Sequence, residues 1–134
     1  MSLTTPPIRI LIVDDEPAIC RALTIAFQRA GYVAFHAISG AAALDLLGRE
    51  PIDVLVVDFR IPDGRGDVTY HYAAAIQPHL RDQTLMVTGD VSERAELLLD
   101  SCGCPYLRKP FSLTDILDAV RALAPGRLDI ARRA

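Results

Sequence analysis

The sequence of 134 residues contains no apolar run near the ~20 residues that a membrane-spanning helix needs. It also lacks the basic segment, long apolar core and cleavage site of a signal peptide at its start. Basic residues form no block before residue 127, and the net charge is −3. We therefore expect no membrane segment and no direct contact with nucleic acid.

Cysteine is scarce. The three residues Cys20, Cys102 and Cys104 are odd in number, and their spacing fits no zinc framework. We expect reduced thiols in a cytoplasmic protein, with Cys20 and Cys102 packed as small core residues. A redox pair of Cys102 and Cys104 is the alternative.

Apolar residues, by contrast, make up 51% of the chain, which is typical of a folded globular protein. The length suits one domain with a sizeable core and is too short for two. We assign residues 1–7 to a disordered or expression-derived N-terminus and residues 8–124 to the domain. Residues 125–134 are assigned to a tail or to the start of a linker.

Two apolar runs end in carboxylates. Residues 53–58 contain four consecutive apolar residues before Asp58, which is typical of a strand buried on both faces of a parallel sheet. Residues 8–13 form a second run, which is followed by Asp14 and Asp15. Open α/β sheets place their chemistry at the carboxyl ends of the strands. We therefore expect the three carboxylates to lie together.

The rest of the chain alternates strands with amphipathic helices. Further strands are predicted at residues 32–37, 84–87 and 106–108. The residues expected to begin or cap helices are Asp15 with Pro17, Ser39, Ser92, and Ser112 with Asp115. Five β-α units with short connections predict a flavodoxin-like (βα)5 α/β fold, with a parallel sheet of order 2-1-3-4-5 and helices on both faces.

Residues 59–66 read as a loop, because proline and glycine are frequent in them. A helix is expected after this loop and should end near Pro78. Its apolar residues are Val68, Tyr72, Ala75 and Ile76.

A group of polar residues follows the predicted strands. The members with side-chain chemistry are Asp14, Asp15, Asp58, Thr88 and Lys109. Several carboxylates without sulfur or nitrogen ligands suit a hard divalent cation, above all Mg²⁺. The cation, the Lys109 ammonium, the Thr88 hydroxyl and the Gly89 amide could together contact a phosphoryl group. Asp58 is then the candidate nucleophile.

Each of these residues has a plainer explanation when it is taken alone. Asp15 could be only a helix cap, Thr88 only a strand residue, and Lys109 only a surface lysine. Their joint appearance after four different strands favours a functional site.

The chain resembles the receiver domain of two-component response regulators over about residues 8–124. The motifs that carry the resemblance are Ile12–Pro17, Val57–Pro62 with Gly66, Val87–Gly89 and Tyr106–Phe111. Together these motifs are highly specific, although each alone is weak. The resemblance implies a phosphoacceptor signalling domain rather than a turnover enzyme.

The resemblance also implies roles for the acidic residues. Asp58 would take a phosphoryl group from a phosphohistidine on a sensor histidine kinase or a phosphotransfer protein. Asp15 would bind Mg²⁺ directly, and Asp14 would act largely through a bound water. Asp58 and the backbone carbonyl of Arg60 would be the other protein ligands of the metal.

The remaining implied roles concern switching. Lys109, Thr88 and Gly89 would contact the phosphoryl oxygens, and the peptide bond before Pro110 would be cis. Thr88 would move toward the phosphoryl group, and Tyr106 would turn inward. This switch would alter the face formed by roughly residues 91–124, to which an unknown output partner would bind. A dimer through this face is an open alternative.

Arg60 and Asp90 lie two residues beyond Asp58 and Thr88, at positions that tune phosphoryl lifetime in this family. Their opposite charges suggest that they pair across the mouth of the site and limit the access of water.

One alternative stays open, and the sequence argues against two other functions. The surroundings of residues 88–90 and 104–106 resemble receivers at the C-terminus of hybrid histidine kinases. A phosphatase with an Asp nucleophile would need an Asp-x-Asp motif after the first strand, where an adjacent Asp pair stands. A flavin or nucleotide binder would need a Gly-rich or Ser/Thr-rich loop there.

Overall fold

The structure, a computed structural model, describes residues 6–90 and 92–124. Its centre is a parallel five-stranded sheet of order β2-β1-β3-β6-β7. The strands are β1 (Arg9–Val13), β2 (Val33–Ala37), β3 (Val54–Asp58), β6 (Thr84–Thr88) and β7 (Tyr106–Arg108). The predicted order 2-1-3-4-5 is therefore confirmed. The assignments made for residues 1–5 and 125–134 lie outside the described residues.

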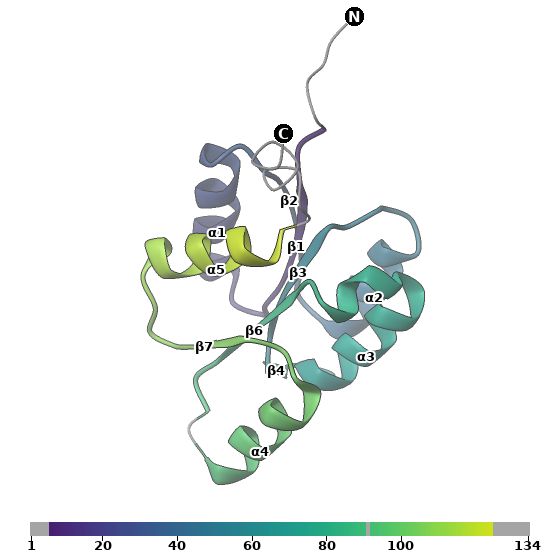
Figure 1. The fold of residues 1–134 in the computed structure, drawn as a ribbon, viewed down its shortest axis with the longest axis vertical. Coiled ribbons are helices and arrows are strands. Elements are labelled where there is room, and N and C mark those ends of the chain that lie inside the picture. Colours follow the sequence, from purple (N-terminus) through teal and green to yellow (C-terminus); the bar gives the residue numbers. More distant parts are fainter. Residues whose placement is uncertain (1–5, 91, 125–134) are drawn as a thin grey trace, which may run out of the picture.

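Helices cover both faces of the sheet (Figure 1). They are α1 (Pro17–Arg29) and α5 (Leu113–Leu123) on one face, with α2 (Gly40–Leu47), α3 (Gly66–Ile76) and α4 (Glu93–Cys102) on the other. Every residue of β3 is buried. Because side chains alternate along a strand, Leu55 and Val57 enter the core under α2, α3 and α4, whereas Val54 and Val56 enter the core under α1 and α5.

Three of the predicted helix caps are confirmed. The Ser39, Ser92 and Ser112 hydroxyls each accept a hydrogen bond from a backbone N–H in the first turn of α2, α4 and α5. In α5, the Asp115 carboxylate accepts a hydrogen bond from the Ser112 N–H, which completes a capping box. These caps fix where each helix begins after the strand edge.

The prediction that Asp15 caps α1 is wrong. The cap position belongs to Glu16, whose side chain makes no cap bond, and Pro17 is the first helical residue. Asp15 lies one residue too early to reach the N–H groups of the first turn. Its carboxylate is exposed and stays available at the edge of the sheet.

Residues 59–66 are more ordered than the predicted loop. They contain a small antiparallel hairpin of β4 (Arg60–Ile61) and β5 (Gly64–Arg65), which a composition rich in Pro and Gly does not reveal. The Asp63 carboxylate in this hairpin accepts bonds from the Gly40 and Ala41 N–H groups. The hairpin is thereby tied to the start of α2.

The helix expected after this hairpin is present as α3, but it presents a different face to the sheet. Val68, Tyr72 and Ile76, spaced at four-residue intervals, are exposed. The buried face instead carries small or polar-tipped side chains, among them Ala73 and Tyr70, whose hydroxyl donates to the Arg81 carbonyl. A 3-10 helix, η1 (Pro78–Arg81), follows α3 and was not predicted.

All three cysteines are free thiols. Cys20 is buried, as predicted, whereas Cys102 is only half-buried and Cys104 is buried in its place. Burial raises the pKa of Cys104 to about 12, so this thiol stays protonated near neutral pH. A reactive Cys102–Cys104 pair is therefore disfavoured, because the thiolate is the form that attacks a disulfide or an oxidant.

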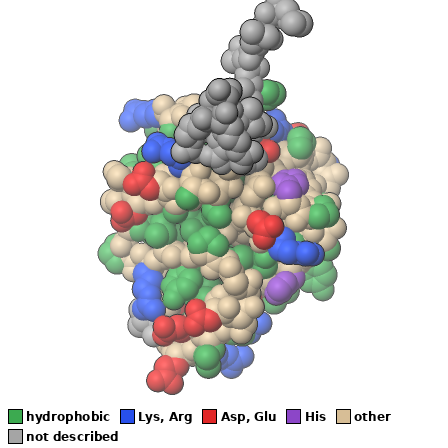
Figure 2. Space-filling model, viewed as in Figure 1, with side chains coloured by type: hydrophobic (Ala, Val, Ile, Leu, Met, Phe, Trp, Pro, Cys, Tyr) green, Lys and Arg blue, Asp and Glu red, His purple; other side chains and the backbone are tan. Residues whose placement is uncertain are grey.

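No helix within residues 6–90 and 92–124 has the length and apolar character needed to cross a bilayer. On the visible face of Figure 2, the described acidic and basic side chains are interspersed in small groups between apolar ones.

Candidate functional site

Strand register brings the predicted site residues to one edge of the sheet. Val13 pairs with Val57, so Asp14, which follows β1, lies next to Asp58, the last residue of the neighbouring β3. In the same way Asp58 lies opposite Val87, and Thr88 lies opposite Arg108, just before Lys109. The ends of β1, β3, β6 and β7 therefore surround one small region.

Three carboxylates meet in this region. Asp14 is 1% exposed, Asp58 is 6% exposed, and Asp15 is open to solvent. One oxygen from each lies within 4.8 Å of the others. A set of carboxylate oxygens at this spacing, one side of which faces solvent, suits a hard divalent metal ion. The Glu16 N–H donates to Asp14 at 2.9 Å and helps to orient that carboxylate.

Lys109 is the only lysine of the chain, and its ammonium lies among these acids. The Nζ atom donates to Asp58 Oδ2 at 2.7 Å and to Asp14 Oδ2 at 3.2 Å. The backbone N–H of Lys109 donates to the Thr88 carbonyl at 2.7 Å, and the peptide bond to Pro110 is cis, as expected. The lysine is thus held by its backbone and directed at the carboxylates.

Burial and the lysine act in opposite directions on Asp58. Burial raises the pKa of Asp58, and the hydrogen bond and charge of Lys109 only partly offset this rise. For Lys109, burial lowers the pKa, but the bond to Asp58 and the charges of Asp58 and Asp14 outweigh it, so that the pKa is raised. The lysine is therefore a permanent cation beside a carboxylate that is costly to ionise.

The Thr88 hydroxyl is turned toward the loop after β6. It accepts a hydrogen bond from the Asp90 N–H at 2.9 Å, and Thr88 is 1% exposed. Gly89 lies against the Lys109 side chain, since a Cβ built on it would be 4.0 Å from Lys109 Cβ and Cδ. Tyr106 is half-buried and lies opposite Met86 on the neighbouring strand.

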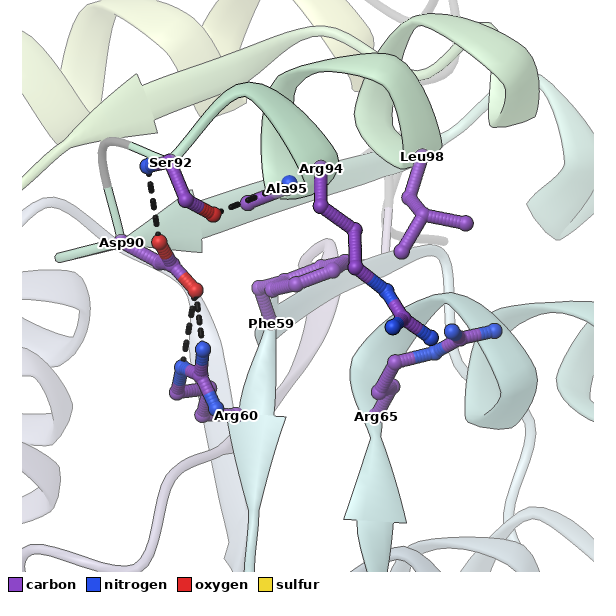
Figure 3. Close-up of a pocket in the computed structure, with 8 residues that line it drawn as sticks. All are labelled: Phe59, Arg60, Arg65, Asp90, Ser92, Arg94, Ala95 and Leu98. Atoms are coloured by element: carbon purple, nitrogen blue, oxygen red, sulfur yellow. Dashed lines mark hydrogen bonds and ion pairs between the residues drawn. The ribbon is translucent and has the colours of Figure 1, made fainter.

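Arg60 and Asp90 form the predicted pair. The Arg60 guanidinium donates to Asp90 Oδ2 through Nε at 3.0 Å and through Nη2 (Figure 3). Asp90 Oδ1 accepts the Ser92 N–H at 2.9 Å. The bonds from Ser92, with a further contribution from Arg60, lower the pKa of Asp90 to about 2. The Arg60 N–H also donates to Asp58 Oδ1 at 3.2 Å, which connects this pair to the acidic cluster.

The role of Gly66 in shaping the site was visible in the sequence only as part of a motif. A Cβ on this residue would lie 2.2 Å from the Asp58 carbonyl oxygen and 3.1 Å from Phe59 Cα. The Gly66 N–H also donates to the Phe59 carbonyl at 2.7 Å. The start of α3 therefore packs directly on the backbone that carries Asp58.

Comparisons with known proteins agree with this geometry. The family "Response regulator receiver domain" matches residues 10–121. The transcriptional regulatory protein CutR of Streptomyces coelicolor is 33% identical over 115 residues, which cover 86% of this chain and 52% of CutR. This chain thus spans about half the length of that relative. Sporulation initiation phosphotransferase F of Bacillus subtilis is 31% identical over 120 residues, which cover 87% of this chain and 94% of that protein.

A solved structure of a response regulator from Burkholderia pseudomallei, described with a phosphorylated aspartic acid, a calcium ion and citrate, superposes with a TM-score of 0.75. It is 25% identical, and the match covers 94% of this chain and 72% of that one. Receiver domains have histidine kinases and phosphotransfer proteins as partners. With the acidic cluster and Lys109 in place, the chain belongs to the response regulator receiver family, as a phosphoacceptor signalling domain rather than a turnover enzyme.

Proposed function

We propose that Asp58 accepts a phosphoryl group from the phosphohistidine of a sensor histidine kinase or phosphotransfer protein, in a Mg²⁺-dependent reaction. The observation that carries this proposal is the position of Asp58. Asp58 is 6% exposed, its carboxylate lies 2.7 Å from the Lys109 ammonium, and one of its oxygens lies within 4.8 Å of oxygens of Asp14 and Asp15.

In this reaction a carboxylate oxygen of Asp58 attacks phosphorus. A P–O bond forms, the P–N bond to the histidine breaks, and the electron pair of that bond stays on the imidazole nitrogen. The product is an acyl phosphate on Asp58. When the attacking oxygen of Asp58 becomes bonded to phosphorus, the Lys109 ammonium can donate its hydrogen bond to a phosphoryl oxygen instead.

Mg²⁺ fits the residues present, because hard cations prefer carboxylate and carbonyl oxygens. Asp14, Asp15, Asp58 and the backbone carbonyl of Arg60 would hold it, with Asp14 acting largely through water. Bound Mg²⁺ neutralises charge on the phosphoryl oxygens. The support from a relative is the calcium ion named with the phosphorylated aspartate in the Burkholderia protein.

Thr88 and Tyr106 form the proposed switch. To donate to a phosphoryl oxygen, together with the Gly89 amide, the Thr88 hydroxyl must turn its hydrogen away from the Asp90 carbonyl, to which it now donates at 3.3 Å. The loop that connects β6 to α4 then changes shape, and Tyr106 turns toward the space that Thr88 leaves. The face of α4, β7 and α5 is thereby altered for a partner, which gains only the affinity difference between the two states.

We assign the receiver to residues 8–124 and a tail or linker start to residues 125–134. We place it in the cytoplasm, where reducing conditions suit three free cysteines. Attachment to a hybrid histidine kinase and dimerisation through α4, β7 and α5 are the alternatives to a free-standing monomer. An unknown output partner would bind this face in a monomer.

The test is intact-mass spectrometry after incubation with phosphoramidate, with and without MgCl₂. We expect one phosphoryl adduct on the wild type in MgCl₂ and none on Asp58→Asn, because the Asn side-chain amide is not a nucleophile near neutral pH. Asp53→Asn is the control, since it changes an aspartate at the opposite end of the same buried strand, where its carboxylate accepts the Arg9 N–H. This variant should still form the adduct.

An adduct that persists in Asp58→Asn would place the acceptor elsewhere and overturn the proposal. Steady release of phosphate from a generic ester without any adduct would point to hydrolysis with an Asp nucleophile.

We also propose that the Arg60–Asp90 pair limits the access of water to the phosphorylated site. Arg60→Ala should speed the loss of the phosphoryl group by about fivefold, because the guanidinium no longer lies across the mouth of the site on Asp90. The measurement is the decay of the adduct by mass spectrometry after removal of the donor. Arg49→Ala removes a comparable exposed pair with Asp45 and should leave the decay rate unchanged. Equal rates of phosphoryl loss in Arg60→Ala and Arg49→Ala would contradict the proposal that the Arg60–Asp90 pair limits the access of water.

A further inference from the structure

A cavity of about 260 Å³ lies between the β4–β5 hairpin and the start of α4. The residues that matter for its chemistry are Phe59, Arg60, Arg65, Asp90, Arg94 and Leu98 (Figure 3). They come from the β4–β5 hairpin, from α4 and from the segments that precede these two. The phosphoacceptor chemistry described above gives no role to Arg65 or Arg94.

The cavity carries an excess of positive charge. Three arginines line it with one carboxylate, Asp90, and that carboxylate is already bound to Arg60. Arg65 uses Nε and Nη2 to bind Asp67 at 3.1 and 3.2 Å. Arg94 makes no ion pair with any residue in the described part of the chain.

The two guanidinium groups of Arg65 and Arg94 converge. Figure 3 shows Arg94 reaching down from α4 and Arg65 reaching up from β5, so that their guanidinium groups point toward one another. The two positive charges repel each other, whereas an anion between them is attracted by both. Each planar guanidinium can donate two parallel hydrogen bonds to one oxyanion.

The inner wall of the cavity is apolar. Phe59 is 3% exposed, Ala95 is 1% exposed, and Leu98 is half-buried. An anion held between the arginines therefore has less water on one side than at an open surface. Charge-assisted hydrogen bonds are stronger where water is partly excluded.

The cavity is also connected to the phosphoacceptor. Phe59 and Arg60 follow Asp58 directly, and the Arg60 N–H is bonded to Asp58 Oδ1. We propose that Arg65 and Arg94 form an oxyanion-binding site for the phosphodonor protein, which holds either its phosphoryl group before transfer or an acidic side chain beside the phosphohistidine. The role in transfer rests on the proposed function of Asp58, whereas anion binding does not.

The first test is anion binding without phosphoryl transfer. Asp58→Asn protein, labelled with ¹⁵N and free of Mg²⁺, is titrated with inorganic phosphate while the arginine Nε–Hε resonances are followed by NMR. We expect saturable shifts of the Arg65 and Arg94 resonances. Adding Arg94→Gln should weaken binding at least about tenfold, because one of two charge-assisted contacts is lost.

Arg121→Gln is the matched control. Arg121 is another exposed arginine, on α5, where it pairs with Asp118. It should leave phosphate binding unchanged. Shifts that grow linearly and equally at Arg121 and Arg94 would mean general ionic screening and would overturn the site, as would saturable shifts confined to residues around Lys109.

A titration with acetate separates the two sources of the anion. Binding of phosphate alone would identify a phosphate group of the donor as the ligand, and comparable binding of acetate would identify an acidic side chain. If neither anion binds saturably, the site is absent.

The second test concerns transfer. The donor is a phosphorylated histidine phosphotransfer protein. In otherwise wild-type protein, Arg94→Gln should raise the concentration of this donor needed for half-maximal phosphorylation about tenfold and leave the maximal rate nearly unchanged, whereas Arg121→Gln should change neither. Unchanged donor dependence would overturn the role in transfer. If the wild type forms no adduct while Asp58→Asn still binds phosphate at Arg65 and Arg94, the proposed function fails and the anion site stands.

Discussion

Replacing Lys109 with Met is expected to lower the free energy of unfolding by roughly 3 kcal/mol. The ammonium of Lys109 lies 2.7 Å from Asp58 and 3.2 Å from Asp14, two carboxylates that are almost fully buried. Methionine keeps most of the side-chain volume and removes the charge, which leaves two like charges facing each other. Urea unfolding at neutral pH without divalent cations measures the effect.

The control for this prediction removes a carboxylate instead. Asp58→Asn leaves the Asp14–Lys109 pair intact and should be at least as stable as the wild type, because burial makes ionised Asp58 costly. In the Asp58→Asn background, Lys109→Met should lower the free energy of unfolding by less than it does in the wild-type background. Excess MgCl₂ should restore part of the stability of Lys109→Met, since the cation replaces the missing positive charge. Equal urea midpoints for Lys109→Met and wild type would contradict the prediction.

The pH dependence of Asp58→Asn has a definite sign. The pKa of Asp58 is raised in the folded state, so the folded protein holds this proton more tightly than the unfolded chain. Stability that this group contributes is present below the unfolded pKa of about 4 and is lost as pH rises through the folded pKa. The advantage of Asp58→Asn over the wild type should therefore be largest near neutral pH and should shrink on acidification.

The features that could be predicted from the sequence are the local and periodic ones. The uninterrupted apolar run before Asp58 predicts a strand buried on both faces, and every residue of β3 is buried. Serine before an apolar periodic segment predicts a helix start, as at Ser39 and Ser112. Because parallel strands end at a shared edge, the cluster of Asp14, Asp15 and Asp58 follows from strand order alone.

The features that could not be predicted depend on contacts between distant segments. Arg94 and Arg65 line the same cavity only because α4 lies beside the β4–β5 hairpin, and no spacing in the sequence reveals this. The outward direction of Tyr72 follows from the rotation of α3, which Ala73 and Tyr70 set by packing inward. For Cys102 and Cys104, which lie two residues apart, burial depends on where α4 ends at Gly103.

Replacing Gly66 with Ala should lower the free energy of unfolding by roughly 3 kcal/mol or more, toward the upper end of the cost of overpacking. The added Cβ would lie 2.2 Å from the Asp58 carbonyl oxygen and 3.0 Å from its carbon. Both are backbone atoms of a central strand, which cannot move aside as the end of a flexible side chain can. The better helix propensity of Ala recovers only about 1 kcal/mol.

The same substitution should also slow phosphorylation, because relief of the clash displaces the backbone of Asp58 from Lys109 and the other acids. Gly48→Ala is the matched control: Gly48 has φ −74° at the end of α2, and its Cβ would meet nothing closer than the Asp45 carbonyl oxygen at 3.5 Å. This variant should be as stable as the wild type or more stable by up to about 1 kcal/mol. Urea unfolding measures both variants, and the rate of adduct formation with phosphoramidate measures the site. A Gly66→Ala protein with wild-type stability and rate would show that the start of α3 can retreat without moving Asp58.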